Sequence, residues 1–125
     1  MKKTLTLITL AALCACAPHY LPDEALGGRV LTCGGHKMTV LLFDGAAWMD
    51  KGAGFTTRMK QVVAASGAKY EEVDHKIEVL WNKGSDWTYY GPHKPGMECK
   101  VMKEYSRKQA QEMYDALPCI KGDCE

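Results

Sequence analysis

Two glycine turns carry the polar side chains of this sequence that are best placed to do chemistry. The first spans residues 66–70 and reads Ser-Gly-Ala-Lys-Tyr, and the second spans residues 82–85 and reads Asn-Lys-Gly-Ser. Each turn places a hydroxyl or an ammonium group beside a glycine, which allows the backbone to approach another molecule closely. Hairpin turns also need glycine for their own geometry, and lysines beside a turn are usually solvated. A binding or catalytic role therefore stands beside a purely structural one.

An enzymatic interpretation rests on Ser66 and Lys69, which match the Ser-x-x-Lys dyad of penicillin-binding enzymes. Residues 83–87 resemble the other two sequence boxes of those enzymes only faintly. The dyad opens a helix in a much larger domain, whereas short strand patterns surround it here. A glycosidase is no better supported, because no pair of carboxylates stands in the apolar surroundings that would raise the pKa of one of them. The sequence does not favour an enzyme.

Whether the cysteines of this chain form disulfides depends on the compartment in which the protein resides. The chain has six cysteines in 125 residues, and four of them lie beyond the N-terminal segment: Cys33, Cys99, Cys119 and Cys124. In an oxidising envelope these four should form two disulfides, for which three pairings exist. Their spacing favours Cys33 with Cys99 and Cys119 with Cys124. A metal site is the rival interpretation, but the sequence has no Cys-x-x-Cys and its histidines are scattered, so we expect no metal and no cofactor.

The N-terminus indicates export and lipidation. Lys2 and Lys3 precede an apolar run over residues 4–13 that suits a secretory signal and is too short for a permanent membrane span. The run ends in Leu-Cys-Ala-Cys, which resembles a bacterial lipobox with Cys16 as the acylated residue. The alternative is cleavage after Ala17 and a soluble secreted protein. We expect a signal peptide over residues 1–15 and a lipidated cysteine with a tether over residues 16–28. Ala17 after that cysteine favours the outer membrane, facing the periplasm.

Composition and charge narrow the function classes. The apolar content of 46% is typical of a globular chain, and the length allows one ordinary domain. The formal net charge is +1, and it falls to about −1 when the two lysines of the signal peptide are removed. A nucleic-acid partner is excluded on this ground, because it would require a surplus of lysine and arginine.

The elements that must position the two turns are short strands. Strand patterns separated by turn signals occupy residues 29–33, 38–43, 46–49, 55–63, 69–72, 76–81 and 87–90. In the sixth of them, one face carries Ile77, Val79 and Trp81 and the other carries Glu78, Leu80 and Asn82, which predicts a strand whose first face is buried. Phe55 and Met59 alternate in the same way. The connections are too short for crossover helices, so the pattern predicts an antiparallel sheet that closes on itself or nearly so.

The period changes after residue 105. Ser106 and Gln109 form a capping-box pattern, with serine at the N-cap and glutamine three positions later. Residues 110, 113, 114 and 117 then place apolar side chains on one face of a helix of about three turns. Pro118 ends the pattern. Such a stripe usually docks on its own sheet, and binding of a partner is the alternative.

The two turns together resemble the membrane-bound and periplasmic inhibitors of C-type lysozyme. The motif Ser-Gly-x-x-Tyr of that family is complete at Ser66, Gly67 and Tyr70. The second motif, Tyr-x-x-x-Thr-Lys-Gly, is matched by Lys83 and Gly84. Glu78 and Asn82 stand at its tyrosine and threonine positions. The resemblance covers roughly residues 29–100. It implies a small barrel of eight antiparallel strands there and leaves residues 101–125 as an added helix and a cysteine-closed tail.

The resemblance also implies a mechanism and a partner. In the family, both turns enter the cleft of C-type lysozyme, and the motif serine and lysine contact its two catalytic carboxylates. Carried over to this chain, the residues of the lysozyme-binding site are Ser66, Gly67, Lys69, Tyr70, Lys83 and Gly84. Tyr70 is expected to pack behind its turn rather than touch the target. The alternative is an envelope lipoprotein that does not inhibit lysozyme and that binds another partner through the barrel or the helix.

Five acidic residues between positions 71 and 86 suggest that electrostatic attraction speeds association with a basic partner. They are Glu71, Glu72, Asp74, Glu78 and Asp86. Because C-type lysozymes are strongly basic by this resemblance, an acidic rim around Lys83 would speed association in a salt-dependent way. A solvated face of the barrel is the alternative interpretation.

Overall fold

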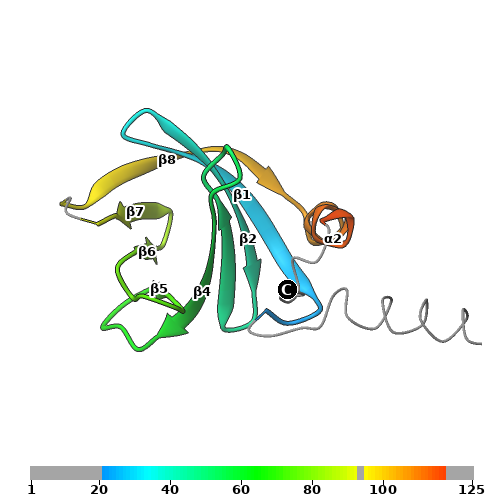
Figure 1. The fold of residues 1–125 in the computed structure, drawn as a ribbon, viewed down its shortest axis with the longest axis horizontal. Helices are drawn as coiled ribbons and strands as arrows, with labels where there is room; N and C mark the ends of the chain where they lie inside the picture. The colour runs from blue at the N-terminus through cyan, green and yellow to red at the C-terminus, as the bar shows by residue number, and fades with distance from the viewer. Residues whose placement is uncertain (1–20, 93–94, 118–125) are drawn as a thin grey trace, which may run out of the picture.

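The computed structural model describes residues 21–92 and 95–117 (Figure 1). The elements of these residues, in chain order, are β1 Ala25–Cys33, β2 His36–Phe43, β3 Ala46–Asp50, β4 Thr56–Val62, β5 Ala68–Glu72, β6 Val79–Lys83, β7 Asp86–Tyr90, β8 Met97–Tyr105 and the helix α2 Arg107–Ala116.

The strands of the described residues form a closed antiparallel barrel in the order β1 to β8. Each strand pairs with its neighbours in the sequence, and β8 pairs with β1 to close the barrel. At this seam Cys33 lies opposite Cys99, and the two cysteines form a disulfide. The predicted fold class, an all-β closed barrel of about eight strands with a C-terminal helix, is confirmed, and so is the pairing of Cys33 with Cys99.

The interior of the barrel is filled by side chains from strands β1 to β7, and the partly buried Met97 and Cys99 of β8 pack against them. Because side chains alternate between the two faces of a strand, every second residue points inward. The buried core comprises Leu31, Cys33, Met38, Val40, Ala47, Met49, Met59, Tyr70, Leu80, Trp87 and Tyr89. Burial of each large apolar side chain contributes roughly 1.5–3 kcal/mol. The barrel is therefore a packed scaffold, and its ends remain to present polar groups.

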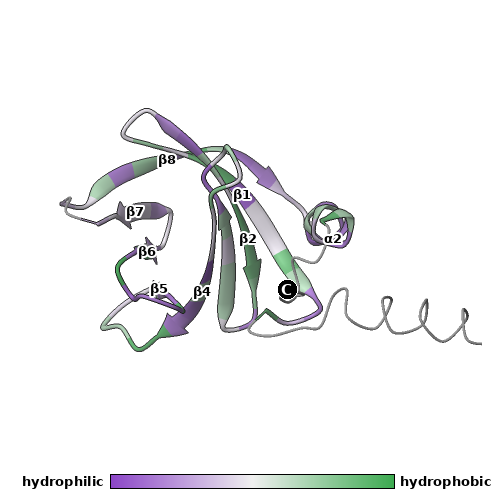
Figure 2. Cartoon of the chain, in the orientation of Figure 1, coloured by the Kyte–Doolittle hydropathy of each residue, from purple (hydrophilic) through white to green (hydrophobic). Residues whose placement is uncertain are grey.

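A second apolar cluster lies outside the barrel, under α2. It comprises Leu21, Ala25, Leu41, Phe43, Ala46, Trp48, Ala110 and Tyr114. Figure 1 shows α2 beside β1, and Figure 2 shows hydrophobic residues on β2 and at the start of β1, next to the helix. The rings of Phe43 and Tyr114 meet edge to face at 4.8 Å between centroids. The predicted stripe thus docks on its own sheet.

The N-terminus of α2 is capped as the sequence predicts. The backbone N–H of Gln109 donates to the hydroxyl of Ser106 at 3.2 Å, and the backbone N–H of Ser106 donates to the Gln109 side chain at 3.0 Å. A serine cap of this kind contributes about 1 kcal/mol relative to alanine. The capping box begins α2 directly after β8, so the helix can turn back onto β1.

Two barrel boundaries differ from the prediction. β1 begins at Ala25, so the last residues of the predicted tether belong to the barrel, and Leu21 is buried beneath α2. The barrel also continues to Tyr105, because β8 extends past residue 100. β8 has no predicted counterpart. Most of its side chains are exposed, so its sequence lacks the apolar alternation that identifies the other strands.

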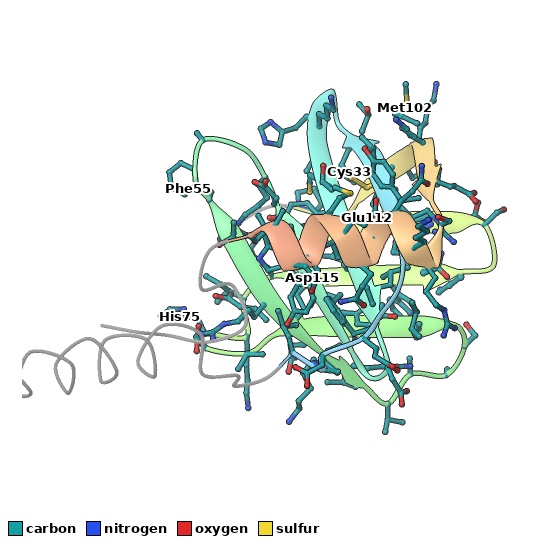
Figure 3. The ribbon with its side chains drawn as sticks, turned by 90° about the vertical axis from the view of Figure 1, so that its right-hand side faces the viewer. Cys33, Phe55, His75, Met102, Glu112 and Asp115 are labelled. Atoms are coloured by element: carbon teal, nitrogen blue, oxygen red, sulfur yellow. A yellow bond between two sulfur atoms is a disulfide. The ribbon has the colours of Figure 1, made fainter. Side chains whose placement is uncertain are left out.

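The turns of the barrel gather at two ends. Connections in an up-and-down barrel alternate between its ends. The turns at residues 63–67 and 84–85 share one end, which we call the loop end. The loops at residues 51–55 and 73–78 share the other, which we call the opposite end. Figure 3 shows Phe55 and His75, one from each of these two loops, on the same side of the molecule.

Several predictions concern residues that the structure does not describe. Cys16, Cys119 and Cys124 lie outside the described residues, and so do the signal peptide and Pro118. In residues 21–92 and 95–117 there is no helical segment with the length and hydrophobicity of a membrane span.

Candidate binding site

The first motif turn connects β4 to β5 and exposes Ser66. Gly67 adopts a φ of 71°, in the left-handed region that favours glycine. A Cβ atom on Gly67 would collide with the carbonyl oxygen of Asn82 and would lie 3.0 Å from the Cα of Lys83. Gly67 is therefore required twice, for its backbone conformation and because the second motif turn passes directly beside it.

The second motif turn is a two-residue hairpin between β6 and β7. Gly84 adopts a φ of 62°, and Lys83 at the end of β6 is exposed. The side-chain amide of Asn82 donates to the carbonyl oxygen of Gly84 at 3.1 Å. Asn82, which stands at the motif threonine position, thus stabilises the turn from within.

The pairing of β5 with β6 brings both turns to the loop end. Ala68 lies opposite Asn82, and Lys69 lies opposite Trp81. The indole N–H of Trp81 donates to the backbone carbonyl oxygen of Ser66 at 2.9 Å, which ties one turn to the other. The residues predicted from the two motifs therefore converge on one end of the barrel, and their backbones are in contact.

Trp81 is a residue of this end that the sequence analysis missed. The ammonium of Lys83 lies 4.2 Å from the centroid of the Trp81 ring, and the ammonium of Lys69 lies 4.9 Å from it. Both distances are in the range of cation–π attraction. The available signal was the spacing, because Lys83 stands two residues after Trp81 and therefore points to the same face of β6.

The predicted buried face of β6 is wrong. Leu80 and Glu78 point into the barrel, with 0% and 6% exposure, whereas Ile77 is 52% exposed and Trp81 is partly buried. The prediction assumed that a glutamate faces water. Here its carboxylate accepts hydrogen bonds inside the barrel. Because side chains alternate between the two faces of a strand, Trp81 then lies on the outer face. In β4, Met59 is buried as expected, but Phe55 precedes the strand and is 67% exposed.

Tyr70 lies behind the first motif turn, in the barrel core. It is 7% exposed, and burial raises the pKa of its phenol. Its ring packs with the other core residues of the barrel. Tyr70 therefore packs behind its turn, as expected.

Glu78, at the motif tyrosine position, belongs to a polar network at the opposite end. Its carboxylate accepts hydrogen bonds from the Lys51 ammonium at 2.7 Å, the Tyr89 hydroxyl at 2.6 Å and the Thr57 hydroxyl at 3.2 Å. Burial alone would raise the pKa of Glu78, but these three donors and the charge of Lys51 outweigh burial and hold the pKa below its ordinary value. The pKa of Tyr89 is raised by its burial and by Glu78.

The predicted acidic rim around Lys83 is wrong for most of its members. Glu78 is buried beside Lys51, Glu72 contacts His75 at 3.1 Å, and Asp74 lies 3.9 Å from Arg58. All three belong to the opposite end, because β5 runs away from the Ser66 turn. Asp86 lies opposite Lys83 in the backbone register of the hairpin, without an ion pair between them. The strand direction, which the sequence pattern left open, separates the acids from the lysine.

The described residues contain no group of three or more histidine, cysteine, aspartate or glutamate side chains that could hold a metal ion. The side chains of Ser66, Lys69 and Lys83 supply a hydroxyl and two ammonium groups at the motif turns, and Asp86, opposite Lys83 in the hairpin, supplies a carboxylate. The hydroxyl and the ammonium groups suit binding of an anionic partner, and carboxylates are the commonest anionic groups of proteins.

Comparison with known protein families identifies the fold. Residues 32–97 match the family model described as membrane-bound lysozyme-inhibitor of c-type lysozyme (MliC), which is more than half of the chain. The chain belongs to the MliC family. No curated protein and no solved structure matches the chain. The match includes both motif turns and excludes α2, which follows it in the sequence.

Membership in the MliC family implies inhibition of C-type lysozyme. It also places the chain among inhibitors rather than enzymes, so the enzymatic interpretations of the Ser66 turn do not apply. The family is described as membrane-bound.

Proposed function

We propose that this protein inhibits C-type lysozyme by inserting both motif turns into the active-site cleft, where Ser66 and Lys83 contact the two catalytic carboxylates. The observation that carries this proposal is the convergence of the two turns at the loop end. Trp81 donates to Ser66 across the turns, and both Ser66 and Lys83 are exposed. A partner can therefore engage a hydroxyl and an ammonium group at the same time.

The chemistry of the target suits these two groups. A retaining glycosidase holds its two carboxyl groups about 5–5.5 Å apart, and its general acid needs a raised pKa. The Lys83 ammonium beside this pair lowers the pKa of the acid and so favours its inactive, deprotonated form. The Ser66 hydroxyl donates a hydrogen bond to the other carboxylate. Occupation of the cleft excludes the polysaccharide, so inhibition needs no covalent step.

The remaining motif residues support the insertion. Gly67 and Gly84 hold left-handed backbone conformations and present no side chain, so the turn backbones can approach the cleft walls. Lys69 adds a second ammonium beside Lys83, over the same ring. Tyr70 fills the core behind the turn and keeps its direction fixed.

A lysis assay tests the proposal. Purified full-length protein should protect a lysozyme-sensitive cell suspension at near-stoichiometric amounts of C-type lysozyme. The double variant Ser66→Ala/Lys83→Ala should lose this protection with an unchanged unfolding midpoint. Lys37→Ala removes an exposed lysine of β2 near the opposite end and is the matched control. Protection by the double variant equal to that of the wild type would contradict the site and redirect attention to α2 and its partner.

We also propose that acylation of Cys16 anchors the protein in the outer membrane. Support comes from the lipobox at residues 13–16 and from a family described as membrane-bound. Stable anchoring needs more than one acyl chain, which lipobox processing supplies. Labelling with a radioactive fatty acid should mark the wild type and not Cys16→Ser, and membrane fractions should show the label with outer-membrane markers. Absence of the label from the wild type would contradict acylation and would support a soluble secreted protein.

The disulfide pairing of the two C-terminal cysteines remains a prediction. We expect Cys119 and Cys124 to pair with each other, because Cys33 and Cys99 already form a disulfide. Mass spectrometry of peptides from the unreduced protein should find the two tail cysteines in one linked fragment. Free thiols there, or a disulfide between two chains, would contradict this pairing.

A further inference from the structure

Trp81 occupies a distinct position among the tryptophans of the barrel. Trp48 and Trp87 are buried, with 3% and 5% exposure, and belong to the apolar clusters. Trp81 is only partly buried and lies on the outer face of β6, opposite Lys69 and two residues before Lys83. It is also placed between the two motif turns. Its packing against the core does not account for this position.

Trp81 contacts both turns through different parts of its side chain. Its indole N–H donates to the carbonyl oxygen of Ser66 at 2.9 Å, so the edge of the ring holds the first turn. The ring itself attracts the ammonium groups of Lys83 and Lys69, at 4.2 Å and 4.9 Å from the centroid. One side chain thus links Ser66, Lys69 and Lys83.

The way in which the two lysines are held leaves their charges available. Among the residues that the structure describes, neither Lys69 nor Lys83 has a carboxylate within ion-pair distance. A ring face attracts an ammonium group without neutralising it, because the attraction comes from the quadrupole of the ring. Two unneutralised positive charges over one ring suit a partner that presents two carboxylates close together.

We propose that Trp81 is the positioning residue of this site, which fixes the Ser66 turn and both ammonium groups before the partner arrives. The inference rests on the proposed function and names the residue on which its affinity depends. Flexible turns would lose side-chain and backbone freedom on binding, and each group already held in place reduces that loss. A fixed pair of ammonium groups also selects a partner whose carboxylates have a matching separation.

Two substitutions of Trp81 separate the contribution of the indole N–H group from that of the aromatic ring face. Trp81→Phe keeps an aromatic face but loses the N–H group, and Trp81→Ala loses both. We expect Trp81→Phe to raise the inhibition constant for C-type lysozyme by up to about fivefold and Trp81→Ala by about tenfold or more. Phe55→Ala, an exposed aromatic residue at the opposite end, is the matched control and should leave the inhibition constant unchanged.

A double-mutant cycle distinguishes positioning from general support of the fold. If Trp81 acts through Lys83, then Trp81→Ala should weaken inhibition less in a Lys83→Ala background than in the wild type, by a factor of about three or more. A residue that only stabilises the barrel would give the same factor in both backgrounds. Equal factors, within about twofold, would overturn the positioning role.

An NMR measurement without lysozyme separates this inference from the proposed function. In the free protein, Trp81→Ala should lower the heteronuclear NOE of the amides at residues 65–67 and leave those at residues 73–75 unchanged. If the wild type inhibits no C-type lysozyme but these turns loosen, the function fails and the positioning role stands. If the wild type inhibits, and Trp81→Ala inhibits equally with rigid turns, the positioning role fails and the function stands.

Discussion

Lys51 and Lys83 lie at opposite ends of one barrel and are held in opposite ways. Lys51 forms an ion pair with Glu78 at 2.7 Å, and the side chain of that glutamate is 8% exposed. Lys83 is exposed and rests on the ring of Trp81. The charge of Lys51 is neutralised by a carboxylate of the barrel, whereas Lys83 has no carboxylate within ion-pair distance among the described residues. In this barrel, the lysine beside a carboxylate is part of the stabilising polar network, whereas the lysine on an aromatic ring keeps an unneutralised positive charge.

The largest effect should come from the opposite end. Glu78→Ala leaves Lys51 and the Tyr89 hydroxyl without their buried acceptor, and we expect a loss of about 3 kcal/mol in the free energy of unfolding. Inhibition per folded molecule should be unchanged, because the site lies at the other end. Urea unfolding monitored by circular dichroism measures the loss, and Glu71→Ala, from the neighbouring strand β5, is the control. A stable variant that does not inhibit would break the separation of the two ends.

Lys83→Ala should show the reverse pattern. Loss of one charged contact in a desolvated cleft should weaken inhibition by about 2 kcal/mol, or about 30-fold in the inhibition constant. The free energy of unfolding should change little, because Lys83 is exposed and its attraction to Trp81 is weak. Comparison with Lys37→Ala in both assays makes the result specific. A lysine that proved important for stability and irrelevant for inhibition would reverse the assignment of the two lysines.

The two motif glycines should differ from each other by about 1 kcal/mol or more in the free energy of unfolding. Gly84→Ala introduces a left-handed alanine into open space, whereas Gly67→Ala also drives its Cβ into the carbonyl oxygen of Asn82. Thermal unfolding of both variants measures the difference. Equal losses would mean that the two turns do not touch in solution, which would also remove the basis for a shared site.

The smallest effect should be a pH dependence that is confined to the opposite end. Because the folded state lowers the pKa of Glu78, the ionised carboxylate contributes stability above its ordinary pKa, near 4.5. This contribution is lost as the pH falls through the lower pKa of the folded state. Urea unfolding between pH 6 and pH 3 should therefore show a steeper acid loss in the wild type than in Glu78→Gln. Parallel curves would contradict the network around Glu78.

The sequence was most informative where local chemistry decides the structure. The Ser106 capping box and the glycine turns each depend on a few adjacent residues and appear as predicted, whereas the predicted strand at residues 76–81 lies at Val79–Lys83 and β8 was not predicted. The closure of the barrel followed from connections too short for crossovers. The resemblance of the two turns added the number of strands and the family.

The predictions that were wrong concern features that depend on contacts between residues far apart in the sequence. Glu78 can point into the barrel because Lys51, 27 residues earlier, and the hydroxyls of Thr57 and Tyr89 donate hydrogen bonds to its carboxylate there. Without those donors, alternation favours Ile77 and Trp81 as the buried face, which is the reverse of the structure. The same limit hid the role of Trp81, because the cross-strand register that places it opposite Lys69 is a property of the assembled sheet.

The burial of Leu21 beneath α2 has a consequence for an anchored molecule. β1 begins and β8 ends at the loop end, so the chain enters the barrel on the side of the motif turns. Leu21 is 3% exposed and is held by the helix. If Cys16 carries the lipid, as proposed, the five peptide units up to Leu21 reach about 18 Å at most. With such an anchor, the contact between Leu21 and the helix would hold the loop end of the barrel within a short distance of the membrane.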